Sequence, residues 1–100
     1  MEVFIRPCQS GRSMEALPSP ALHMDLMALE ERLETSGWQP VVNAGVMLIV
    51  RKDHEATIYG NGKVVVKSRD DGVMRRVWDE LAPHLEAAGG TPVARAPSAA

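Results

Sequence analysis

The sequence has little of several features that define common classes of small protein. Its 100 residues include one cysteine, Cys8, which excludes an internal disulfide framework and a cysteine-rich zinc site. No apolar run approaches the roughly 20 residues that a membrane-spanning helix needs. The first residues do not combine a basic region with a long apolar segment, so no secretory signal is expected. We therefore expect a cytoplasmic protein without a membrane partner.

Aromatic residues make up only 4% of the chain, whereas hydrophobic residues as a whole make up 45%. The core must therefore be built mainly from aliphatic side chains and the 6 methionines. A single domain of this size buries only about two-thirds of its unfolded surface. Association with a second copy would bury more, so a homodimer is one expectation. The net charge of −2 argues against a general nucleic-acid coat protein.

The N-terminal residues are expected to form a strand followed by a loop. Val3 and Ile5 alternate with Phe4 and Arg6 within residues 1–7, which is typical of a strand. Residues 8–19 are rich in Ser, Gly and Pro, and this composition predicts a loop.

A helix is predicted to follow this loop. Ser19 is its expected cap, Pro20 suits the first helical position, and Gly37 ends it. One apolar stripe runs along the predicted helix, formed by Leu22, Leu26, Leu29 and Leu33.

The second half of the chain is expected to form four strands and a second helix. The strands are expected around 41–42 and over 46–52, 55–59 and 63–67. The last two form a hairpin about Gly60-Asn61-Gly62, because Gly and Asn accept positive φ. The second helix begins at a cap formed by Asp70 or Asp71, and Pro83 is expected to kink or break it.

This order of elements predicts an α+β domain over residues 1–87. It would contain one mostly antiparallel, five-stranded sheet with both helices on one face. Residues 88–100 are small, rich in Pro and without periodicity, so a disordered C-terminal tail is expected there.

A three-residue turn at 60–62 fixes which side chains share a face of the sheet, because side chains alternate along a strand. The face covered by the helices is expected to hold Ala56, Ile58, Val64 and Val66, with Val46, Leu48 and Val50 from the preceding strand. The opposite, open face is expected to hold Thr57, Tyr59, Lys63, Val65 and Lys67, with Met47, Ile49 and Arg51 from the preceding strand.

Charge is unevenly distributed between the two sides of this predicted fold. Residues 45–69 contain five Lys or Arg against two acidic residues, a local charge of +3. Residues 19–36 contain four acidic residues against one Arg, a local charge of −3. The sequence thus predicts a basic sheet and an acidic helical side.

The stretch ATIYGNGKVVVKSRDDGVMRRVWDELAPHL, residues 56–85, resembles the second half of one repeat of the TATA-box-binding protein. That resemblance implies a curved antiparallel sheet of five strands under two helices, half of a saddle whose concave face grips the DNA minor groove. A chain of one repeat's length would act alone or rebuild the saddle as a homodimer. The resemblance places Tyr59 at a wedge phenylalanine position, with Thr57, Lys63, Val65 and Lys67 lining the groove.

Three functional hypotheses follow. The first is nucleic-acid binding, with Lys63, Lys67 and Arg51 meeting phosphates. The second is a protein-interaction or assembly module, in which a partner covers the apolar part of the open face formed by Met47, Ile49, Tyr59 and Val65.

The third hypothesis is a thiol enzyme, which requires Cys8 to be acidic and exposed. No His or Asp is obviously placed to activate that thiol, so a non-enzymatic protein is expected. The spacings of His23, His54 and His84 match no metal motif, so neither a metal nor another cofactor is expected.

Overall fold

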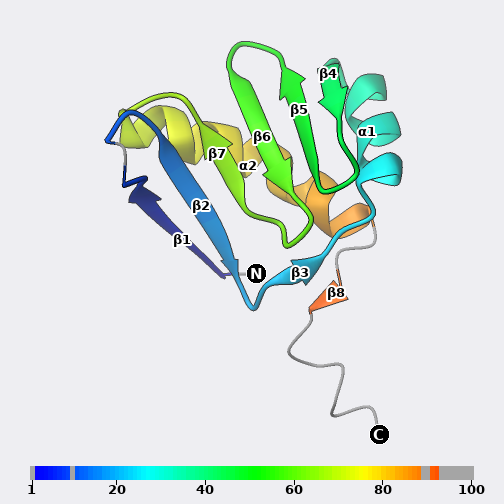
Figure 1. The fold of residues 1–100 in the computed structure, drawn as a ribbon, viewed down its shortest axis with the longest axis horizontal. Helices are drawn as coiled ribbons and strands as arrows, with labels where there is room; N and C mark the ends of the chain where they lie inside the picture. The colour runs from blue at the N-terminus through cyan, green and yellow to red at the C-terminus, as the bar shows by residue number, and fades with distance from the viewer. Residues whose placement is uncertain (1, 10, 89–90, 93–100) are drawn as a thin grey trace, which may run out of the picture.

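The structure is a computed structural model, and it describes residues 2–9, 11–88 and 91–92. It is an α+β fold in which an open antiparallel sheet has the strand order β1-β2-β7-β6-β5-β4 (Figure 1). The strands of this sheet are β1 (Glu2–Pro7), β2 (Met14–Ser19), β4 (Gln39–Asn43), β5 (Met47–Arg51), β6 (Glu55–Tyr59) and β7 (Val64–Val66). A second, two-stranded ladder pairs β3 (Leu22–His23) with β8 (Thr91–Pro92).

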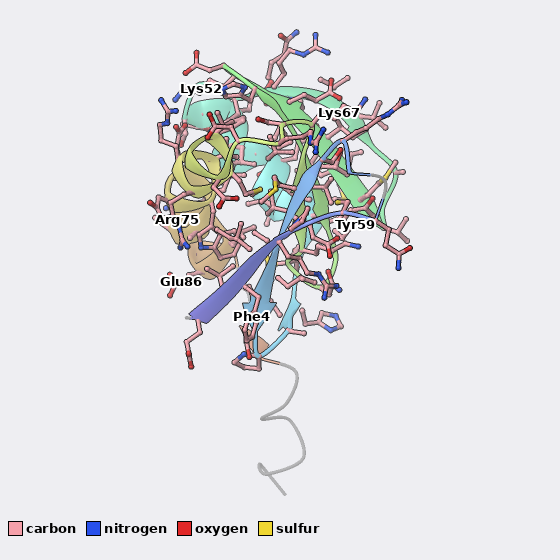
Figure 2. The ribbon with its side chains drawn as sticks, turned by 90° about the vertical axis from the view of Figure 1, so that its left-hand side faces the viewer. Phe4, Lys52, Tyr59, Lys67, Arg75 and Glu86 are labelled. Atoms are coloured by element: carbon pink, nitrogen blue, oxygen red, sulfur yellow. The ribbon has the colours of Figure 1, made fainter. Side chains whose placement is uncertain are left out.

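Both helices, α1 (Leu26–Thr35) and α2 (Asp71–Ala87), lie on one face of the sheet, as the sequence predicts (Figure 2). Helix α1 packs against β4 and β5, whereas α2 packs against β1, β2 and β7. The core lies between these helices and the sheet. Its largest fully buried side chains are Leu29, Leu33, Leu48, Val50, Ile58, Val64, Val66, Met74, Leu81 and Leu85.

The hairpin of β6 and β7 has the predicted register. Ile58 lies opposite Val64, and Thr57 lies opposite Val65. At the turn, the backbone N–H of Tyr59 donates to the carbonyl oxygen of Lys63 at 2.9 Å, which closes a three-residue loop. Gly62 has a φ of +89°, a conformation that glycine adopts without steric cost.

The predicted loop over residues 8–19 is wrong in its second half, because Met14–Ser19 forms strand β2. Met14 and Ala16 face the core, while Glu15 and Leu17 between them are only half-buried. This is the period-two pattern of a strand with one buried face. Strand β2 inserts between β1 and β7, so the sheet has six strands rather than the five expected.

Helix α1 begins six residues after the predicted start. Its cap is Asp25, whose carboxylate accepts hydrogen bonds from the backbone N–H groups of Met27 and Ala28. The segment before it is extended instead, because the N–H groups of Leu22 and Met24 donate to carbonyl oxygens of the β6–β7 turn. The predicted end is close, since Ser36 caps the helix and Gly37 follows with a φ of +93°.

Helix α2 begins as predicted, with Asp70 as its cap accepting a hydrogen bond from the N–H of Gly72 at 2.7 Å. A kink or a break is expected at Pro83, and the break is wrong, because the helix continues through this residue to Ala87. Most of the predicted tail over residues 88–100 lies outside the described residues. Within it, Ala88 caps α2 and Thr91–Pro92 forms β8.

Val46 is the one predicted member of the covered face that does not lie there. Strand β5 begins at Met47, so Val46 belongs to the preceding turn and its side chain is 74% exposed. The strand begins one residue after Val46, so the alternation of buried and open positions does not extend to this residue. Leu48 and Val50 do lie in the core.

Candidate binding surface on the open face of the sheet

The sheet has a second face, opposite the helices, which we call the open face. It is defined by the side chains that alternate with the core residues along the strands. Its members in the strands and the β6–β7 turn are Glu2, Phe4, Arg6, Glu15, Leu17, Gln39, Val42, Met47, Ile49, Arg51, Glu55, Thr57, Tyr59, Lys63, Val65 and Lys67.

The centre of the open face is a row of side chains that crosses the sheet. The register places Glu15 opposite Val65, Val65 opposite Thr57, and Thr57 opposite Ile49. Val42 completes this row on β4, opposite Ile49, and is 45% exposed. Directly opposed side chains in antiparallel strands contact one another, so four of the five positions form a continuous row of small and apolar groups.

A second row lies toward the β6–β7 turn. Met47 lies opposite Tyr59, and the ammonium of Lys63 stands over the Tyr59 ring, 4.7 Å from its centroid. This is a cation–π geometry. At the far side of the sheet Phe4 lies opposite Leu17, and Phe4 is 69% exposed. The open face thus carries aromatic side chains on β6 and on the edge strand β1.

Most basic side chains of the open face form ion pairs with carboxylates of the same face. Arg51 donates to the Glu55 carboxylate at 2.7 Å, and Lys67 approaches the same carboxylate at 3.9 Å. Arg6 pairs with Glu15 at 2.7 Å. The Arg51 guanidinium and its hydrogen bond lower the pKa of Glu55, so this carboxylate stays ionised near neutral pH.

The eight side chains predicted for the binding surface are all brought together on this face. Lys52, which contributes to the predicted local charge of +3, points elsewhere: its ammonium pairs with Glu80 of α2 at 2.8 Å. Figure 2 shows Lys52 on the helical side, while Tyr59 and Lys67 lie on the opposite side of the sheet. The basic character of the open face is therefore weaker than the sequence count suggests.

Five further side chains of this face do not follow from the predicted hairpin alone: Glu2, Phe4, Arg6, Glu15 and Leu17. They lie on β1 and β2, and β2 is the strand that the sequence reading assigns to a loop. The signal for it was present as the alternation of Met14, Ala16 and Pro18 with Glu15 and Leu17. The flanking Ser, Gly and Pro residues masked that signal.

Cys8 lies at the end of β1, half-buried, with its Sγ 3.7 Å from Oε1 of Glu15. Burial and the neighbouring Glu15 carboxylate raise the pKa of this thiol. A nucleophilic cysteine needs the opposite shift, since the thiolate is the reactive form. These surroundings therefore favour the protonated form of the Cys8 thiol near neutral pH.

A small cavity of about 60 Å³ lies on the helical side, away from the open face. Its lining includes Trp38, Lys52 and Glu80, and the Lys52 ammonium stands 5.8 Å from the Trp38 ring centroid. Among the described residues, Nε1 of Trp38 is a buried side-chain donor without a hydrogen-bond partner. His54 also lines the cavity, whereas His84 lies between the helices and accepts a hydrogen bond from Arg32 at 3.1 Å.

Within residues 2–9, 11–88 and 91–92, no three metal-ligating side chains come together. In the same part of the chain, neither helix combines the length and apolar character needed to cross a bilayer. No protein-family model, curated protein or solved structure matches the chain.

Proposed function

We propose that the chain is a non-enzymatic binding domain whose open face docks another macromolecule, and that the ligand is a protein. One observation carries this proposal. The centre of the open face is an apolar row, while three of the four basic side chains around it already have an acidic partner.

The apolar row supports a protein ligand, because protein interfaces have an apolar, tightly packed centre and a polar rim. Ile49, Thr57 and Val65 form that centre, and the ion pairs of Glu15 and Glu55 stand beside it. A partner that covers the row would remove apolar surface from water without separating the ion pairs.

The charge balance supports the same choice. Arg6, Arg51, Lys63 and Lys67 give +4, and Glu2, Glu15 and Glu55 give −3, so these groups sum to +1. Affinity for nucleic acid comes largely from Lys and Arg that neutralise phosphates. A phosphate would have to compete with carboxylates already 2.7 Å from Arg6 and Arg51.

Nucleic-acid binding is the second candidate, because Lys63 has no acidic partner in the described structure and stands over Tyr59. An aromatic ring beside a cation is suited to stacking on a base next to a phosphate. The resemblance to a repeat of the TATA-box-binding protein supports this candidate too. It would require the sheet to be curved as half of a saddle.

The proposal is tested by placing a photo-reactive benzoylphenylalanine at position 57, the centre of the open face, in the full chain expressed in cells. A matched variant carries the same group at Glu31, an exposed residue of α1. We expect a discrete protein adduct from position 57 that is lost when Ile49→Lys is added, and none from position 31. Equal adducts from both positions, or none from either, would overturn the proposal.

The nucleic-acid candidate is tested by fluorescence anisotropy of labelled duplex and single-stranded DNA at low and moderate salt. Binding that falls with salt and disappears in a Lys63→Glu, Lys67→Glu double variant would replace the protein ligand with nucleic acid. Absence of binding at low salt would remove this candidate.

A further inference from the structure

We propose that β1 is a dimerisation edge, at which a second copy of this chain pairs antiparallel to Glu2–Pro7 with Phe4 opposite Phe4 of the other copy. The pairing would join two six-stranded sheets into one. Figure 2 looks onto the side of the molecule that β1 forms, and β1 crosses in front of the other strands.

The two edges of the sheet differ in how they resist such pairing. Strand β4 has a register irregularity between Pro40 and Val42, and Pro40 has no backbone N–H. Bulges and prolines are common devices that keep an edge strand from pairing with another chain. Strand β1 is paired with β2 without interruption over its whole length, and its only proline is the last residue, Pro7.

The sequence of β1 is complementary to itself in one antiparallel register. With Phe4 opposite Phe4 of the other copy, the symmetry places Glu2 opposite Arg6, and Val3 opposite Ile5. Each opposite-charge pair occurs twice, once on either side of the twofold axis. Opposed side chains in antiparallel strands lie within contact distance, so charge and size match at every position from 2 to 6.

Neighbouring registers lose this match. A shift by two residues in one direction places Phe4 opposite Arg6, and in the other direction places Phe4 opposite Glu2. Symmetric registers with an odd offset would oppose side chains that point to different faces of the sheet. Only the register centred on Phe4 therefore satisfies both charged residues.

The two faces of the paired edge have different roles. Val3 and Ile5 pack against the core on the helical side, while Glu2, Phe4 and Arg6 follow the open face. The exposed Phe4 rings would cover one another at the twofold axis. Arg6 already pairs with Glu15 at 2.7 Å, and its guanidinium has enough donors to bind Glu2 of the other copy as well.

One six-residue strand pair buries less surface than a standard protein interface, so a dissociation constant in the range of about 1–100 μM is expected. This inference does not depend on the proposed ligand of the open face, because it concerns the edge and not the central row.

Sedimentation velocity over a concentration series measures the dimer directly. We expect Phe4→Lys to raise the dissociation constant at least about tenfold, because it opposes two ammonium groups at the axis. Val46→Lys is the matched control, since Val46 is as exposed as Phe4 but lies in the β4–β5 turn, and it should leave the dimer unchanged. Glu2→Lys, which leaves the Arg6–Glu15 pair intact, should also weaken the dimer.

The register is tested by cross-linking in a Cys8→Ser background. Phe4→Cys should form a disulfide-linked dimer under mild oxidation, whereas Glu2→Cys should not, because its symmetry mate lies about four residues away along the strand. A wild-type protein that stays monomeric at about 1 mM would overturn the proposal. So would a dimer that is unchanged by both charge variants, or equal cross-linking of the two cysteine variants. The Thr57 adduct and the dimer are separate readouts, so failure of one does not decide the other.

Discussion

Leu48, Val50, Ala56 and Ile58 have no exposed surface, while Met47, Ile49 and Thr57, which alternate with them on the same two strands, keep part of theirs. The first set packs beneath the helices, and the second set forms the middle of the open face. One pair of strands therefore serves two purposes at alternate positions. The covered face specifies the fold, whereas the open face can vary in chemistry at little cost to the fold.

The largest expected effect is a difference in lost stability when each of two isoleucines on adjacent strands is replaced by alanine. Ile58→Ala removes a fully buried side chain and leaves a cavity, so it should lower the free energy of unfolding by about 2–5 kcal/mol. Ile49→Ala, at a half-buried position of the open face, should cost less than half as much. Urea denaturation of both variants measures the difference, and equal losses would contradict the distinction between the faces.

The next largest effect on stability is expected at Gly62 in the β6–β7 turn, where the side chains of Pro18 and Leu22 pack closely against the backbone. A Cβ at Gly62 would lie 2.9 Å from Cγ of Pro18 and 3.2 Å from Cβ of Leu22, and the φ of Gly62 is +89°. Gly62→Ala should therefore cost roughly 1–3 kcal/mol of unfolding free energy. Gly60→Ala is the control, because its nearest neighbour is a carbonyl oxygen 4.0 Å away. Similar denaturation midpoints for the two variants would show that the contact is not tight.

A smaller effect is expected in the pH dependence of the unfolding free energy, and it arises at His84 between the helices. Burial, and then the nearby Arg32 cation, lower the pKa of His84 below its ordinary value of 6.5, outweighing the opposite influence of Glu80. As the pH falls below about 6.5 the unfolded chain binds a proton that the folded chain resists, so stability should decline. His84→Gln keeps an acceptor for Arg32 and removes the titration. Its urea midpoint should change less between about pH 7.5 and 5.5 than that of the wild type.

The smallest effect on stability is expected on the open face, at Glu55. This partly exposed carboxylate is paired with Arg51, and the lowered pKa means that its stabilising contribution is present above about pH 4.5 and lost below it. At neutral pH, Glu55→Gln should leave the urea midpoint within experimental error, because surface ion pairs contribute little. A clear loss of stability would show that the open face is held more tightly than its exposure indicates.

The hairpin, the interior strand β5 and the cap of α2 could be predicted because their signals are local. Turn residues fix the hairpin register, and Asp70 precedes an apolar stripe of helical period. For the same reason, the eight side chains predicted for the binding surface could be placed on one face.

The N-terminal part of the chain could not be predicted as well, because its structure depends on distant partners. Leu22 fits the stripe of the predicted helix, but its N–H donates to Asn61, and this pairing holds the chain extended. Strand β2 likewise depends on β1 and β7 for its hydrogen bonds. Phe4 was on a predicted strand, yet its edge position became apparent only from the order of strands.

The hydrogen bonds from Leu22 and Met24 to the β6–β7 turn tie together segments that are far apart along the chain. Closing so long a loop costs conformational entropy, and this cost is offset only once the contacts between the two segments have formed. The start of α1 is thus anchored to a late part of the sequence rather than to its own neighbours. During synthesis, the N–H groups of Leu22 and Met24 have no native acceptors until the β6–β7 turn has been made, so the segment that leads into α1 cannot take its native conformation before then.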